Sequence, residues 1–118
     1  MSVDYHGRRF RALGGGDGTY AEYHQHGDLV WATFEGGHVR RGTVTGVCGP
    51  TGVLRLAYTM VLVTGEVIAG NSVNTPQWHG GHLVLREVWE RHGDNAAKGV
   101  SYLEEVLAAE LELAGAAR

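Results

Sequence analysis

Glu87 is the residue in this sequence with the clearest potential for chemistry. It lies in the segment His82–Arg91, where strand alternation puts every second side chain on the same face. Leu83 and Leu85 share that face with Glu87, and Trp89 follows on it. If the leucines point inward, the carboxylate does too, and burial raises its pKa. Such a group can act as a general acid or base or can anchor a ligand; the alternatives are a structural carboxylate and a reversed assignment of the two faces.

Tyr58 belongs to a second segment with one apolar face, Val53–Val63. Arg55 and Thr59 lie on its polar face. If the protein is an enzyme, Glu87 moves a proton and Tyr58 donates a hydrogen bond to a developing oxyanion. The residues of the apolar face, which we expect to point inward, are Leu54, Leu56, Tyr58, Met60 and Leu62.

Aromatic and apolar side chains near these two residues are candidates for contact with a ligand. Trp31, within the letters LVWATFE, is either core filler or an aromatic platform, and a buried indole N–H needs an acceptor. The catalytic candidates are Glu87 and Tyr58, and the ligand-binding candidates are Tyr23, His24, Trp31, Leu56, Met60 and Trp89.

Histidines beside glycines form the other group with potential chemistry. In an antiparallel meander successive turns alternate between two ends, which predicts one histidine-rich end with Cys48 nearby. The pair His24-x-His26 has the spacing of two zinc ligands, and a pH-responsive or ligand-gating mouth is another interpretation. Since turn histidines are usually solvated, we assign no metal site and expect no cofactor. The histidines of this end are His6, His24, His26, His79 and His82.

Glycines divide the chain into short segments with strand character. Seven turn signals containing glycine occur at positions 14–18, 27, 36–37, 49–52, 65, 80–81 and 93. The segments between them are rich in Tyr, Thr, Val and Trp with alternating polarity, which predicts eight strands. They are Tyr5–Leu13, Thr19–His26, Leu29–Glu35, His38–Cys48, Val53–Val63, Glu66–Asn74, His82–Arg91 and Ala97–Glu105.

Eight strands joined by tight turns predict a closed barrel, because closure removes exposed strand edges. We expect an all-β, eight-stranded antiparallel up-and-down barrel over residues 1–105, with a two-sheet sandwich as the alternative. The tail over residues 106–118 is rich in Ala, Leu and Glu and predicts a short C-terminal helix, although Val100–Glu105 also fits the eighth strand. A barrel of this size either is filled by side chains or holds one small ligand.

Composition excludes several classes of protein. The single cysteine, Cys48, excludes an internal disulfide and a cysteine-based zinc cluster. The chain has no apolar run long enough for a membrane span, and its start, MSVDYHGRRF, has no signal-peptide stretch, so we expect a cytoplasmic protein without a membrane partner. A net charge of −3 argues against a nucleic-acid partner. A homodimer is the protein partner that we consider.

The letters RALGGG at 11–16 fit the R-x-x-G-x-G pattern of acyl-CoA loops in acetyltransferases. That chemistry needs a helix directly after the loop, and the following letters DGTYAEYHQ predict a strand. We therefore do not expect an acetyltransferase.

Several stretches together resemble a group of small bacterial proteins labelled N-acetylglutamate synthase-like. The resemblance covers about residues 4–105 and implies a calycin-type or avidin-like (lipocalin-like) barrel. Barrels of that kind bind small, often apolar molecules, and some are cofactor-free cyclases or isomerases. The stretches are DYHGRRFR (4–11), YHQHGDLVWATFEGG (23–37), Gly42-x-Val44-x-Gly46, LRLAY (54–58), LVLREVW (83–89) and GDNAAKGVSYLEE (93–105).

Three functions are compatible with these patterns. The first is binding of a small, largely apolar molecule inside the barrel, with Glu87 orienting a polar group of the ligand. The second is a cofactor-free cyclase or isomerase of natural-product biosynthesis that uses Glu87 as acid or base. The third is a structural or interaction module with a filled barrel.

Overall fold

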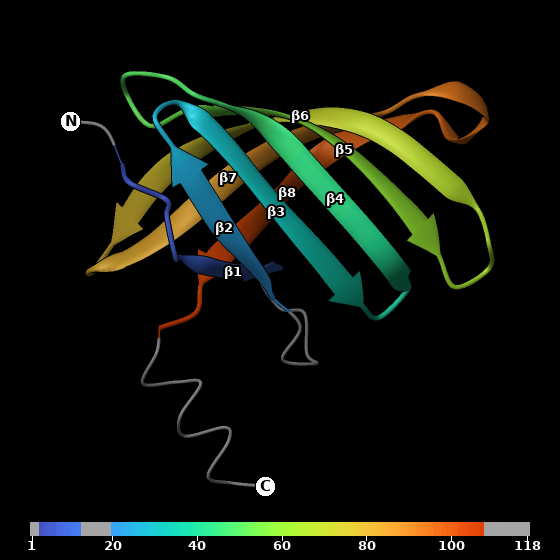
Figure 1. Ribbon diagram of the computed structural model, residues 1–118, viewed down its shortest axis with the longest axis horizontal. Helices are drawn as coiled ribbons and strands as arrows, with labels where there is room; N and C mark the ends of the chain where they lie inside the picture. Colours follow the sequence, from blue (N-terminus) through green and yellow to red (C-terminus); the bar gives the residue numbers. More distant parts are fainter. Residues whose placement is uncertain (1–2, 13–19, 108–118) are drawn as a thin grey trace, which may run out of the picture.

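The chain forms a closed antiparallel barrel in which neighbouring strands follow one another in sequence order (Figure 1). The computed structural model describes residues 3–12 and 20–107. The prediction of an eight-stranded up-and-down barrel is confirmed, and closure excludes the two-sheet sandwich. The strands are β1 (Arg9–Ala12), β2 (Ala21–His26), β3 (Leu29–Gly36), β4 (Val39–Cys48), β5 (Leu54–Leu62), β6 (Val67–His79), β7 (His82–Arg91) and β8 (Ala97–Glu105), with a 3-10 turn, η1 (Gly93–Asn95), before β8.

Six of the seven predicted glycine turns separate observed strands, and the seventh, at 14–18, lies outside the described residues. Gly27 in the β2–β3 turn and Gly37 in the β3–β4 turn have φ values of 61° and 58°, a region that side chains with a Cβ disfavour. The expected helix falls mostly on residues 108–118, which lie outside the described part of the chain.

β6 is longer than expected, because it continues through Pro76 to His79. Its pairing with β5 ends at Asn74, and beyond that point it pairs with β7 alone. One side of this extension is therefore a free edge, where a proline is tolerated. The β6–β7 hairpin projects past the neighbouring strands (Figure 1).

One half of the barrel is filled by the strands' inward apolar residues. Along β5, Leu54, Leu56 and Met60 are buried while Arg55 and Thr59 are exposed, as the alternation predicts. The side chains with no exposed surface include Leu54, Leu83, Leu85 and Val30.

The segment before β1 closes this filled half. Tyr5 is completely buried, and its hydroxyl donates a hydrogen bond to the carbonyl of Gly52 in the β4–β5 turn. Its backbone N–H donates to Gln25 Oε1 at 2.9 Å. Val3 packs in the same core cluster. The segment Val3–Tyr5 therefore acts as a plug, which explains why β1 begins at Arg9 and not at Tyr5.

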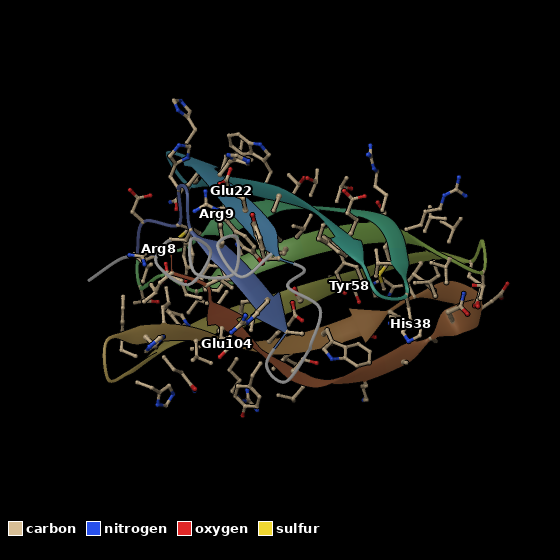
Figure 2. The ribbon with its side chains drawn as sticks, turned by 90° about the horizontal axis from the view of Figure 1, so that it is seen from below. Arg8, Arg9, Glu22, His38, Tyr58 and Glu104 are labelled. Carbon is tan, nitrogen blue, oxygen red and sulfur yellow. The ribbon has the colours of Figure 1, made fainter. Side chains whose placement is uncertain are left out.

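Ion pairs fasten the short strand β1 into the barrel. β1 pairs through two residues with β2 and through three with β8. Arg9 bonds Glu22 of β2 at 2.9 Å, and the two side chains lie together in Figure 2. Arg11 bonds Glu104 of β8 at 2.8 Å. The closure between first and last strands is thus supported on both sides by side-chain contacts.

Candidate functional site

A cavity of about 520 Å³ occupies the half of the barrel away from the plug. Its lining runs from Gly36 and Gly37 at the end of β3 to Ser72 and Leu56 deeper in the barrel. The described residues therefore leave space inside this half of the barrel. Tyr58 points into the space between the strands, and His38 lies at the opening's end of the molecule, away from Arg8 (Figure 2).

Three glycines on the strands make room for aromatic rings in this cavity. Each glycine is the direct cross-strand partner of an aromatic residue, and a Cβ on it would collide with that ring. At Gly99 the added carbon would lie 2.7 Å from the Trp89 ring. The aromatic rings of the cavity wall therefore pack directly against the backbone of the neighbouring strand. The pairs are Phe34 on Gly42, Tyr58 on Gly70 and Trp89 on Gly99.

Glu87 lines the cavity, as the alternation in β7 predicts. Its pKa is raised above the ordinary value, mainly because burial disfavours the charged form; a hydrogen bond from Ser72 acts in the opposite sense. The prediction that this carboxylate points inward is confirmed, and its role in a site stays a prediction.

Ser72 connects Glu87 to a fully buried amide. Asn74 Nδ2 donates to Ser72 Oγ at 3.0 Å, so the Ser72 hydroxyl proton is left for the Glu87 carboxylate. Asn74 has no exposed surface, and its Oδ1 has no hydrogen-bond partner among the described residues. The cross-strand partner of Asn74 is Glu87 itself. A short polar chain therefore runs from the core to the cavity wall.

Trp89 is held in place at its polar and apolar sides. The indole Nε1 donates to Ser101 Oγ at 3.0 Å, and the Arg91 guanidinium lies 5.5 Å from the ring centroid. Trp89, Arg91 and Ser101 all line the cavity. The indole therefore has its acceptor and presents a fixed apolar surface.

The Tyr58 hydroxyl has a partner on the barrel wall. It donates to the backbone carbonyl of Glu90 at 3.2 Å, passing over Gly70. Burial raises the pKa of Tyr58, Arg91 lowers it and Glu87 raises it further. A single O–H donates once, so this hydroxyl serves a ligand as a donor only after leaving Glu90.

The cavity brings together six of the eight candidate residues, and it leaves two outside. The interior placement of Trp31 is wrong, because β3 turns Val30 and Ala32 inward and leaves Trp31 exposed. His24 also faces outward, since it follows the buried Tyr23 on β2, and its ring stacks on Trp31 with centroids 5.6 Å apart. The six that line the cavity are Tyr23, Leu56, Tyr58, Met60, Glu87 and Trp89.

The histidine-rich end lies at the plugged end of the barrel. The plug contacts Gln25 near the β2–β3 turn and Gly52 in the β4–β5 turn, so these two turns lie at one end, as the alternation predicts. The cavity lining instead reaches Gly36 and Gly37 in the β3–β4 turn, at the opposite end. His6 and His24 have ring centroids 5.9 Å apart. Within residues 3–12 and 20–107, no three side chains of the metal-binding types gather into a site. The histidines therefore form no mouth to this cavity.

Several polar residues in the cavity wall or behind it were missed in the sequence. Ser72 and Asn74 share the inward face of β6 with Ile68 and Gly70, so the same alternation that placed Glu87 identifies them. Ser101 is the cross-strand partner of Glu87 on β8. The feature that identifies these residues in the sequence is a polar side chain at an inward-facing strand position.

Comparison with known proteins assigns the chain to a family. Residues 3–106 match the model of the avidin-like protein family, which is nearly the whole chain. Neither the curated proteins nor the solved structures contain a match. The comparisons give no support to the N-acetylglutamate synthase-like label. In the part of the chain that the structure describes, no helix has the length and apolarity to span a membrane. With its closed eight-stranded barrel and a family match over residues 3–106, this chain belongs to the avidin-like protein family.

Proposed function

We propose that this protein binds a small, largely apolar molecule inside its barrel. The observation that carries the proposal is the cavity of about 520 Å³, walled by aromatic and aliphatic side chains and supplied with a few polar groups. Its volume lies in the range of sites for small organic molecules. Membership of the avidin-like family is consistent with a ligand held in the barrel.

The polar groups are placed to orient such a ligand. Glu87 and Ser72 lie on adjacent strands at the inner part of the cavity, whereas Glu35 and Gly36 lie at its opening. An apolar body would contact the rings of Tyr23, Phe34 and Trp89, and its polar group would meet Glu87. Small-molecule sites typically combine a mainly apolar lining with a few polar groups that orient the ligand.

Native mass spectrometry of the purified protein tests for a bound molecule. A mass above that of the chain, lost on denaturation, is the expected result. The cavity-filling variant Val44→Phe should lose this mass, because Val44 lines the cavity. Thr43→Phe adds the same ring to the outer face of β4 and should keep it. Retention of the mass by Val44→Phe, with an unchanged circular dichroism spectrum, would contradict binding inside the barrel.

A second candidate is catalysis of a cyclisation or isomerisation in the same cavity. The observation that favours it is the position of Glu87 in the cavity wall, where burial raises the pKa of its carboxyl group in the direction that suits a general acid or base. The bond from Tyr58 to Glu90 counts against Tyr58 as an oxyanion donor, and binding is therefore our first choice. Glu87→Gln separates the two: an enzyme loses turnover and keeps its affinity, whereas a binding protein shows changed affinity and has no turnover to lose.

Self-association into a homodimer is a further part of the proposal. Val73, Val88 and Val100 are cross-strand neighbours on β6, β7 and β8, and 39%, 44% and 49% of their surfaces are exposed. This apolar row on the outside of the barrel is a suitable contact surface. Sedimentation equilibrium of Val88→Glu should show a weaker dimer than the unmodified chain, with Thr59→Glu on β5 as the control. Equal behaviour of the two variants would contradict a dimer through this row.

A further inference from the structure

We propose that the ligand is an amphipathic cation, whose apolar body fills the aromatic cavity and whose protonated amine lies against Glu87. This inference rests on the proposed binding function and adds the charge of the ligand to it. It follows from the absence of a cationic partner for Glu87 among the described residues and from the rings that surround this carboxylate.

The arginines that line the cavity have other partners. Arg11 is paired with Glu104 at 2.8 Å, and the Arg91 guanidinium lies 5.5 Å from the centroid of the Trp89 ring. None of the ion pairs of residues 3–12 and 20–107 involves Glu87. A half-buried carboxylate with one hydroxyl as its donor has free acceptor capacity, and supplying an opposite charge there offsets the cost of its burial.

Aromatic rings surround the position that such a charge would take. Tyr23 and Tyr58 are close enough to Glu87 for its charge to raise the pKa of each phenol. Trp89 is two residues from Glu87 on the same face of β7. The faces of the two phenol rings carry negative potential and attract an ammonium group, whereas they give a neutral alcohol no comparable gain. The Trp89 ring lies against Gly99 and beside the Arg91 guanidinium, so it contributes apolar contact to the ligand body.

Amine binding should be linked to the proton of Glu87. In the free protein burial raises the pKa of this carboxyl group, and a cation beside it favours the ionised form. Affinity for an amine should therefore increase as the pH rises through the pKa of Glu87, with release of a proton on binding. The charged and titratable groups that face Glu87 or line its cavity are Tyr20 just before β2, Tyr23 on β2, Tyr58 on β5, Arg91 on β7, Arg11 on β1 and Glu35 on β3; its neighbours Ser72, Asn74 and Ser101 do not titrate.

Isothermal titration calorimetry with three probes of one shape tests the inference. Phenylbutylamine, phenylbutanol and phenylbutyrate share an apolar body that fits the cavity and differ only in their polar end. The amine should bind about tenfold more tightly than the alcohol, and the acid should bind most weakly. The titrations are repeated in buffers of different ionisation enthalpy. The binding enthalpy should depend on the buffer for the amine alone, because only the amine releases protons on binding. Glu87→Gln should lower the affinity for the amine about tenfold and leave that for the alcohol unchanged, while Glu90→Gln, on the outer face of β7, should change neither.

The outcomes separate this inference from the function on which it rests. Equal affinities for amine and alcohol, or a preference for the acid, would overturn the cationic ligand while leaving small-molecule binding in place. Failure of all three probes to bind at millimolar concentration would count against the binding function itself. The comparison of probes and the proton release use the unmodified chain, so they hold even if Glu87→Gln fails to fold.

Discussion

The indole Nε1 of Trp89 on β7 donates a hydrogen bond to Ser101 Oγ on β8 at 3.0 Å. The same ring covers Gly99, the cross-strand partner of Trp89. The bond satisfies the polar edge of the indole, and the glycine lets its face approach the backbone. Trp89 is therefore a fixed part of the cavity wall, and its fluorescence can be used to follow changes there.

Ser101→Ala should lower the free energy of unfolding by about 1 kcal/mol, because the part-buried indole N–H loses its acceptor. Urea denaturation measures this change. In a Trp31→Phe, Trp78→Phe background, Trp89 is the only tryptophan left, and its emission maximum should shift. Ser101→Thr keeps the hydroxyl and should restore both values; failure of threonine to do so would show that the hydrogen bond is not the cause.

Gly99→Ala should destabilise the fold by about 1–3 kcal/mol, because its Cβ lies 2.7 Å from the Trp89 ring and must displace it. Gly49→Ala is the matched control, since its Cβ meets only the Val53 carbonyl at an ordinary 3.6 Å. Thermal denaturation compares the two variants. Similar melting temperatures would mean that the ring has room to move and that the glycine is not required there.

Glu87→Gln should make the protein more stable at neutral pH and should do so less as the pH falls. The folded-state pKa of Glu87 is raised, so the folded protein binds this proton more tightly than the unfolded chain does. Stability from this group is fully present below the unfolded pKa and is lost as the pH rises through the folded pKa. Glutamine removes that loss. Urea denaturation between pH 4 and pH 7 measures the difference, and Glu90→Gln, on the exposed face of β7, should show no such dependence.

Tyr5→Phe should cost about 1–2 kcal/mol in unfolding free energy, because the buried carbonyl of Gly52 loses its donor. Tyr102→Phe removes a hydroxyl from an exposed ring on β8 and should change stability by less than about 0.5 kcal/mol. Chemical denaturation distinguishes them. An equal effect of the two changes would mean that the plug is not held by its hydroxyl.

Strand alternation predicted most of the architecture because it reports burial directly. The inward position of Glu87 follows from Leu83 and Leu85, and both leucines are fully buried. Trp31 misled the same reasoning because β3 is apolar on both faces. Leu29 and Trp31 alternate with Val30 and Ala32, and the bulk of tryptophan does not say which set is inside.

The open end of the barrel was beyond sequence reasoning for a different reason. Turn order assigns residues to an end but does not say which end is filled. That depends on Tyr5, whose hydroxyl meets a carbonyl 47 residues later in the chain. The partners of Ser72 and Asn74 depend in the same way on cross-strand geometry. Long-range contacts of this kind leave no local pattern to read.

The plug formed by Val3 and Tyr5 closes one end of the barrel, so the cavity does not run through it. Among the described residues the cavity lining reaches the end of the barrel at Gly36 and Gly37, so a ligand bound as we propose would enter and leave at that end. A ligand longer than the cavity would extend out of it beside Gly36 and Gly37. If the proposed binding holds, a molecule joined by that end to a larger carrier would fit the site without any rearrangement of the strands.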